Sequence, residues 1–127
     1  MKHQEVNERI IGVFYEVYNE LGHGFLESVY EQSMAIALSE GGLKVVQQAP
    51  INVRFRGHPV GEFRADLLVN DLVIVELKAA RAMESAFEAQ MMNYLRATNV
   101  EVGLLMNFGP NPEFKRFVYD NERKASR

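Results

Sequence analysis

Residues 64–78 read RADLLVNDLVIVELK, and this stretch decides the fold. Leu, Val and Ile dominate it, and the polar pair Asn70-Asp71 interrupts them where a turn is expected. The pattern predicts a strand from Val60 to Val69 and a second strand from Leu72 to Lys78. The two strands would form an antiparallel hairpin.

The apolar pattern fixes the register of this hairpin, because directly opposed residues lie on the same face of a sheet. Pairing Leu67 with Val75 makes one face wholly apolar and sets Asp66 opposite Glu76 on the other face. A register shifted by one residue sets Asp66 against Val75 and mixes polar with apolar residues on both faces. The sequence therefore favours the first register, which requires a loop with an odd number of residues.

A further strand precedes the hairpin. Apolar and polar residues alternate over residues 51–56, and Gly57-His58-Pro59 ends the run. A turn at these three residues aligns Val53 with Phe63. The polar face that carries the two carboxylates would then continue across all three strands.

Apolar residues recur at helical spacing in three segments, residues 6–21, 26–38 and about 85–98. Glycines follow the first two segments where a helix is expected to stop. Two short segments after the third helix, 102–106 and 114–119, predict further strands, the second of them at a sheet edge. The order of elements predicts an α/β fold with a mixed sheet flanked by helices.

The composition bounds the organisation of the chain. Its 127 residues, 47% hydrophobic and 24% charged, predict one domain over residues 1–127, with a core of about 5–119 and a frayed tail at 120–127. The absence of cysteine excludes disulfides and thiolate chemistry, so oxygen or imidazole must hold any metal. Residues 1–10 do not resemble a signal peptide, and we expect a cytoplasmic protein without membrane contact. The net charge of −3 means that contact with a polyanion must be local.

The predicted register brings the Asp66 and Glu76 carboxylates within roughly 5 Å of each other. A cation would relieve their repulsion, and a site built from oxygen ligands suits Mg²⁺ or Mn²⁺. Lys78, two residues after Glu76, faces the same way and could steady an attacking water or the charge on a phosphate. These charges could also be an ordinary solvated surface. The apolar residues around Glu76 favour a site, because a charge on a central strand requires a reason.

Four motifs in order resemble a known family. The string GFLESVY at residues 24–30 matches the signature GxxExxY. Three further regions are similar to the same family: residues 64–79, 89–98 and 102–109. Over residues 5–119 the chain thus resembles the GxxExxY proteins of the PD-(D/E)xK nuclease superfamily. The resemblance implies a restriction-endonuclease-like core, in which helices flank a mixed four-stranded sheet.

The resemblance also implies roles for individual residues. Metal ligation falls to Asp66, Glu76 and Glu27, and the catalytic set adds Lys78 and Gln90. Glu27 would bind the metal directly or through water, and Tyr94 would line the same cleft as Gln90. Each role has a structural alternative. Glu27 could cap its helix, Gln90 could satisfy backbone groups, and Tyr30 and Tyr94 could be core residues.

Two functions follow from these residues. The first is a nuclease, endo- or exonucleolytic, that uses Mg²⁺ or Mn²⁺ to hydrolyse DNA or RNA, with substrate contacts from Tyr30, Arg54, Arg64 and Tyr94. The second is a catalytically silent module that binds nucleic acid or a protein partner. Relatives often carry a histidine where Phe87 stands, and its loss favours the silent module. Without a separate DNA-recognition domain, a specific nuclease would need a partner protein or a homodimer.

Overall fold

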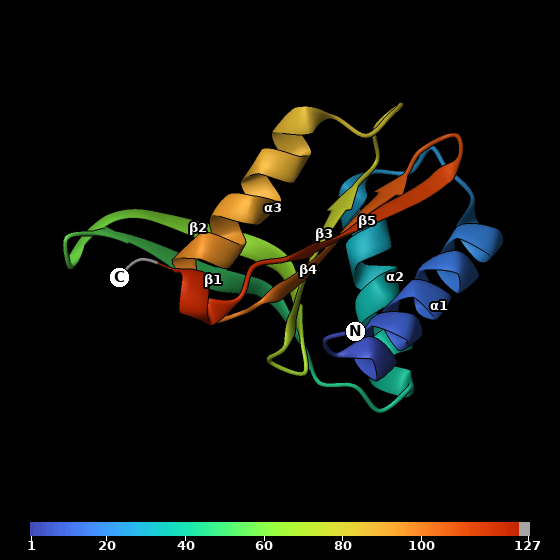
Figure 1. The fold of residues 1–127 in the computed structure, drawn as a ribbon. Helices are drawn as coiled ribbons and strands as arrows, with labels where there is room; N and C mark the ends of the chain where they lie inside the picture. The colour runs from blue at the N-terminus through green and yellow to red at the C-terminus, as the bar shows by residue number, and fades with distance from the viewer. Residues whose placement is uncertain (125–127) are drawn as a thin grey trace.

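A five-stranded mixed sheet forms the centre of the computed structural model, which describes residues 1–124 (Figure 1). The strands lie in chain order: β1 (Val45–Phe55), β2 (His58–Val69), β3 (Val73–Lys78), β4 (Val102–Phe108) and β5 (Pro112–Val118). Neighbouring strands are antiparallel except β3 and β4, which are parallel. This confirms the predicted α/β fold class with a mixed sheet.

Helices cover both faces of the sheet. The helices α1 (Gln4–Leu21) and α2 (Glu27–Glu40) pack on one face, and α3 (Ser85–Ala97) packs on the other (Figure 1). Every residue of β4 is buried, and so is every residue of β3 except Lys78, as expected of strands covered on both sides. No helix within residues 1–124 is both long and apolar enough to cross a membrane.

The β2–β3 hairpin has the predicted register. Leu67 pairs with Val75 and Val69 with Val73, and a three-residue loop joins the strands. Asn70 and Asp71 have positive φ angles of 51° and 57°, a conformation that Asn and Asp tolerate better than most residues. The odd-length loop therefore follows from the turn chemistry as well as from the apolar pattern.

The predicted alignment of β1 with β2 is wrong by two residues. Val53 pairs with Gly61 rather than with Phe63, and a bulge follows between Val53 and Arg54. The turn consists of Arg56 and Gly57, whose φ angles of 50° and 80° suit the tight two-residue turns of hairpins. The turn thus comes earlier than predicted, and β2 already begins at His58.

Side-chain alternation along β2 is interrupted at Asp66. Ala65 packs in the apolar cluster under α3, whereas Leu67, two residues on, packs in the cluster under α1 and α2. Residues two apart in a regular strand share a face. Gln48, which lies between the β1 partners of these two residues, has a φ angle of 53°. The irregularity falls on one of the two candidate metal ligands.

The expected continuous polar face is not present on the inner part of the sheet. Leu68 and Ile74 pack instead with Met91 and Leu95 of α3. The reason is the crossover between the parallel strands β3 and β4, which carries α3 back over the sheet. The carboxylates therefore lie beside a second core rather than on an open surface.

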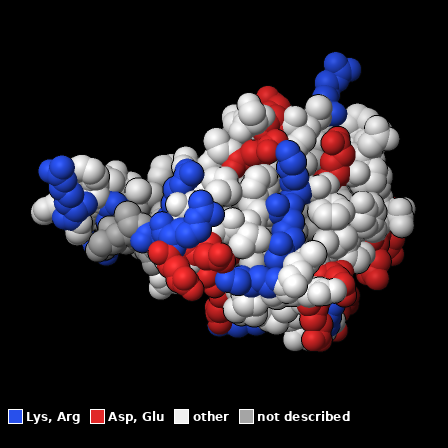
Figure 2. Space-filling model, in the orientation of Figure 1, with Lys and Arg blue, Asp and Glu red and all other residues white. Residues whose placement is uncertain are grey.

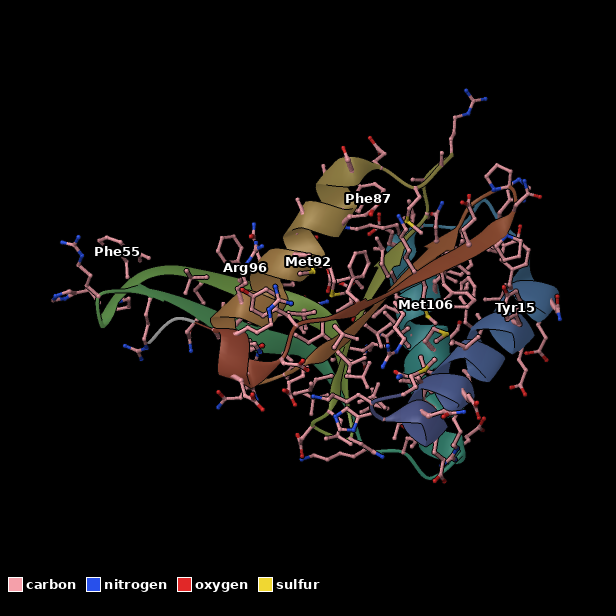
Figure 3. All side chains as sticks on the ribbon, in the orientation of Figure 1. Tyr15, Phe55, Phe87, Met92, Arg96 and Met106 are labelled. Carbon is pink, nitrogen blue, oxygen red and sulfur yellow. The ribbon has the colours of Figure 1, made fainter. Side chains whose placement is uncertain are left out.

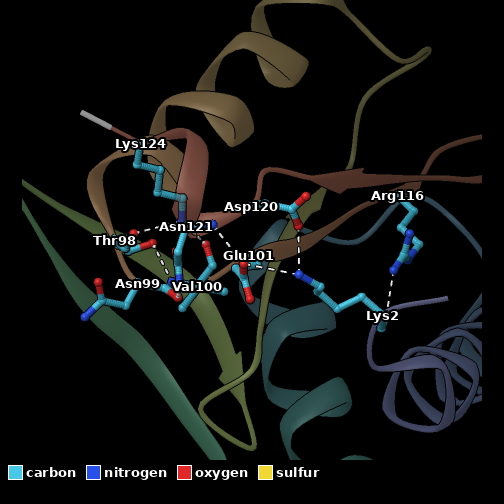
Figure 4. A network of polar contacts seen from close by, with 9 residues as sticks. All are labelled: Lys2, Thr98, Asn99, Val100, Glu101, Arg116, Asp120, Asn121 and Lys124. Atoms are coloured by element: carbon cyan, nitrogen blue, oxygen red, sulfur yellow. Dashed lines mark hydrogen bonds and ion pairs between the residues drawn. The ribbon is translucent and has the colours of Figure 1, made fainter. Parts of the chain in front are cut away.

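Residues 120–124 are held to the body, although the composition of residues 120–127 is typical of a frayed tail. Asp120 accepts a 2.7 Å hydrogen bond from Lys2 Nζ (Figure 4). Lys124, which follows the short 3-10 helix η1 (Asn121–Arg123), donates from Nζ to the carbonyls of Thr98 and Val100, between α3 and β4. Residue 124 is thereby held against the segment that joins α3 to β4. Residues 125–127 lie outside the described range.

Candidate metal centre

The side chains of Asp66 on β2 and Glu76 on β3 each accept a hydrogen bond from a backbone N–H of the other strand. The Asp66 N–H donates to Glu76 Oε2 at 2.7 Å, and the Leu77 N–H donates to Asp66 Oδ2 at 2.8 Å. The backbone ladder between these strands stops at the Leu67–Val75 pair. Each carboxylate is therefore held by a backbone N–H of the neighbouring strand, just beyond the point where the ladder ends.

Burial and mutual repulsion disfavour the charged forms of this pair. Glu76 is only 4% exposed, and its burial raises its pKa to about 8, with a further contribution from the Asp66 charge. Burial likewise raises the pKa of Asp66. The pKa of the Tyr94 hydroxyl is raised by burial and by both carboxylates, which places Tyr94 beside them. A cation between the carboxylates would offset these costs.

The chemistry of the two carboxylates fits Mg²⁺ or Mn²⁺. Each of them spends one oxygen on a backbone N–H, so its second oxygen can serve a metal. Within residues 1–124, no three His, Asp or Glu side chains gather closely enough to hold an ion on their own. Mg²⁺ tolerates this, because it keeps several waters and shares substrate phosphates.

Glu27 lies at the exposed start of α2, in the first helical turn. Its charge contributes to the raised pKa values of both Asp66 and Glu76, so it is near them, but it completes no three-ligand group among the described residues. Its place also agrees with the alternative of an acid in the positive first turn of a helix.

Glu31 is a further acidic residue near Asp66, and the motifs of the sequence do not include it. It lies one helical turn after Glu27, and its charge raises the pKa of Asp66 more than that of Glu27 does. Its carboxylate accepts hydrogen bonds from the side chains of Gln47 at 3.1 Å and Gln48 at 2.7 Å. The spacing of four residues from Glu27 could have identified it, because such residues share a helix face.

Lys78 is held by α3. Its Nζ donates to Gln90 Oε1 at 3.4 Å and lies 4.9 Å from the centre of the Phe87 ring. Figure 3 shows Phe87 near the start of α3, on the side of the helix that meets the sheet. Phe87 thus covers the lysine. The structure brings Lys78 and Gln90 together, as the resemblance implied.

Tyr30 is a core residue, and its expected contact with substrate is corrected. It is fully buried, and its ring stacks on Phe108 at 4.1 Å. Its hydroxyl donates to the Gly22 carbonyl at 2.7 Å and accepts from the Phe25 N–H. These contacts join the start of α2 to the core, and they leave no surface for a substrate.

The two arginines of the expected substrate contacts lie on the hairpin of β1 and β2. Arg64 is exposed and donates from Nη1 to the Gln48 carbonyl at 3.1 Å. Arg54 is also exposed, and its Nη1 reaches the Gly57 carbonyl at 3.4 Å. Both side chains remain accessible to a ligand.

The chain that leaves Lys78 is anchored by a buried asparagine. Asn107 Oδ1 accepts from the Ala80 N–H at 2.9 Å, and its Nδ2 donates to the Ala80 carbonyl at 3.0 Å. The backbone of Gly109 approaches the same carbonyl so closely that a Cβ would collide with it. The chain just beyond Lys78, at the end of β3, is therefore fixed to β4.

We expect Gly109→Ala to lower the free energy of unfolding by about 1–3 kcal/mol, because the added methyl overpacks against the Ala80 backbone. Gly12→Ala is the matched control. A Cβ at Gly12, within α1, would meet nothing within 4 Å, and alanine should stabilise the helix by about 0.5–1 kcal/mol. Urea denaturation of both variants tests this, and a Gly109→Ala protein as stable as Gly12→Ala contradicts it.

Comparisons with known proteins bear on the family and the fold of this chain. Residues 4–117 match the family described as the PD-(D/E)XK nuclease superfamily. A search of the curated proteins finds no match. The crystal structure of SSO0001 superimposes with a TM-score of 0.60 at 15% identity, over 73% of this chain and 50% of that chain. An alkaline exonuclease (LHK-Exo) from Laribacter hongkongensis gives a TM-score of 0.45 at 10% identity, over 96% and 73%.

This chain therefore spans about half the length of SSO0001, and that likeness shows a shared fold. The family match covers more of this chain than the structural likeness does. It covers nearly the whole chain, and it includes the Asp66 and Glu76 carboxylates and the Lys78 ammonium, which the hairpin and α3 hold together. On this match, the chain belongs to the PD-(D/E)XK nuclease superfamily.

Proposed function

We propose that the chain is a nuclease that hydrolyses phosphodiester bonds with a divalent metal, Mg²⁺ or Mn²⁺, held by Asp66 and Glu76. The observation that carries the proposal is the pair of hydrogen bonds by which backbone N–H groups of the two strands hold the buried Glu76 carboxylate and the half-buried Asp66 carboxylate. A family whose members act on nucleic acid supports the substrate class. DNA is the first candidate substrate and RNA the second.

Each residue of the site has a chemical task in this proposal. An ion bound there would supply Lewis-acid activation of water and phosphate. Asp66 and Glu76 are oriented by backbone N–H groups, so their oxygens are fixed before any ligand arrives. Lys78 places a positive charge at the edge of the site, where charge develops on phosphate, and Gln90 orients it. Glu27 would act through water.

Replacing Lys78 with methionine tests the proposal. We expect the rate of Mg²⁺- or Mn²⁺-dependent cleavage to fall on the order of 10²–10³-fold, because the variant removes an electrostatic contribution to the transition state while both carboxylates remain. Single- and double-stranded DNA and RNA should be incubated with each protein. Lys44→Met, at an exposed lysine paired with Asp71, is the matched control and should cleave like the wild type. Equal rates for the two variants would remove Lys78 from the mechanism.

The second candidate is a catalytically silent module that binds nucleic acid or a protein. Two observations favour it: Phe87 covers the ammonium of Lys78, and the described residues supply no third metal ligand. Titration calorimetry with Mn²⁺ discriminates the two. Metal binding that disappears in Asp66→Ala, with no cleavage of any polymer by the wild type, supports the silent module. Absence of metal binding by the wild type contradicts the proposed metal-dependent nuclease.

A further inference from the structure

A groove of about 780 Å³ lies between the β1–β2 hairpin and α3. The hairpin contributes Val53, Arg54 and Phe63 to its walls, and Tyr119 together with η1 closes one end. In Figure 1 the hairpin extends well beyond the body of the sheet, with α3 standing over its base. The groove therefore lies between the protruding β1–β2 hairpin, called the arm below, and the helix α3, outside the core.

The groove is basic in a chain that is acidic overall. The described residues that line it include Arg54, Arg96, Arg123 and Lys124 and no Asp or Glu, whereas the whole sequence has 14 Lys and Arg against 17 Asp and Glu. Figure 2 shows basic side chains gathered at the base of the hairpin, and Figure 3 places Arg96 there on α3. A local positive field of this kind attracts a polyanion despite the net charge.

Aromatic rings accompany these charges. Phe63 is 49% exposed, and its ring lies 6.1 Å from that of Tyr94. The guanidinium groups of Arg96 and Arg123 lie 5.4 Å and 4.7 Å from the Tyr119 ring. Exposed rings and arginine planes are the surfaces on which unpaired bases stack. The bases of a duplex are already stacked on one another and present no free face to such rings.

Two residues that line the groove also interact with residues of the candidate metal centre. Gln90 and Tyr94 line it, and the same Gln90 accepts the hydrogen bond from Lys78. The raised pKa of the Tyr94 hydroxyl also reflects the charges of Asp66 and Glu76. A strand that lies in the groove would thus bring its phosphates toward the carboxylates.

We infer that this groove binds a single-stranded segment of nucleic acid and directs it to the Asp66–Glu76 site. Bases stack at Phe63 and beside Tyr119, and phosphates lie along Arg54 and Arg96. The directing role rests on the proposed nuclease function, whereas strand binding stands on the groove itself. The substrate class is therefore a single strand or the unpaired end of a duplex, rather than an uninterrupted duplex.

Fluorescence anisotropy tests the inference in EDTA, with labelled single-stranded DNA and RNA of about 12 nucleotides, within the range of known site sizes, and a blunt duplex of equal length. We expect both single strands to bind more tightly than the duplex. Phe63→Ala should weaken single-strand binding by about 10-fold, through the loss of one stacking contact. Arg96→Gln should lower the slope of log K against log salt by about 0.7, for one lost phosphate contact.

The matched controls lie away from the groove. Phe114 is 37% exposed on β5, where its ring contacts Tyr15 of α1, and Arg81 is exposed in the loop before α3. Phe114→Ala and Arg81→Gln should bind like the wild type. The inference is overturned if the duplex binds as tightly as the single strands, or if Phe63→Ala weakens binding no more than Phe114→Ala.

The inference and the proposed function fail separately. Cleavage by the wild type that requires Lys78 but is indifferent to Phe63 and Arg96 removes the groove and keeps the nuclease. Single-strand binding that depends on Phe63, with no cleavage under any metal, keeps the groove and removes the nuclease. Measuring both properties on the same variants therefore assigns any failure to one of the two.

Discussion

Asp66→Asn is expected to lower the metal-dependent cleavage rate by at least about 100-fold and to abolish the heat of Mn²⁺ binding. Replacing a residue that only orients a metal ligand lowers metal affinity or activity roughly 10–100-fold, so replacing a ligand itself should have a larger effect. Asparagine keeps an oxygen that can accept the Leu77 N–H, so the hairpin should stay folded. The loss would therefore report the missing negative charge rather than a broken hairpin.

Asp71→Asn is the matched control for this experiment. Asp71 is exposed in the loop between β2 and β3, and its carboxylate pairs only with Lys44 in the described structure. The substitution Asp71→Asn removes one negative charge from the same hairpin, as Asp66→Asn does, but at a distance from Glu76. Rates and metal affinity like those of the wild type are expected. If Asp66→Asn cleaves as fast as Asp71→Asn, Asp66 holds no catalytic metal.

The metal-free protein should become less stable as the pH rises from about 5 to 8. The pKa of Glu76 is raised from its ordinary value of 4.5 to about 8, because the folded protein buries it beside Asp66. Between these values the unfolded chain has released the Glu76 proton and the folded chain still holds it. The folded state thus binds more protons, and the free energy of unfolding falls by about 1.4 kcal/mol per pH unit.

Urea denaturation in EDTA at a series of pH values measures this slope. Glu76→Gln isolates the residue, because glutamine can still accept the Asp66 N–H but does not titrate. We expect the variant to lose most of the pH dependence and to be the more stable protein at pH 8. Wild type and variant curves that run parallel from pH 5 to 8 would show that Glu76 ionises normally in the folded protein.

The central hairpin could be predicted from sequence because its physics is local. Only one register of β2 on β3 separates Leu67 and Val75 from Asp66 and Glu76, so the apolar pattern alone determines which carboxylates meet. The exchange of side-chain and backbone hydrogen bonds was not predictable, since it depends on the two strands separating beyond Leu67. The membership of the chain among the GxxExxY proteins stays a prediction from the motif at residues 24–30.

Long-range packing accounts for what the sequence did not reveal. The β1 alignment failed because Arg56 adopts a positive φ, which few arginines do, and the more evident turn signal at residues 57–59 was misleading. The first half of β1, with Gln47, Gln48 and Pro50, has no alternation to reveal it. The covering of Lys78 by Phe87 needs α3 to return over the sheet, and periodicity does not specify where a helix docks.

The interruption of alternation at Asp66 divides the hairpin into two parts that tolerate substitution to different degrees. On the β3 side of Asp66, Leu67 packs in the core under α1 and α2, where a change in side-chain volume disturbs the close packing around it. Toward the turn at Arg56-Gly57, the side chains of Phe55, Val60 and Phe63 are exposed, so substitutions of these residues change the free energy of unfolding little. A residue pair inserted at the tip would lengthen the arm while the carboxylates stayed in place. The exposed part of the hairpin can therefore change in length and sequence without moving Asp66 and Glu76.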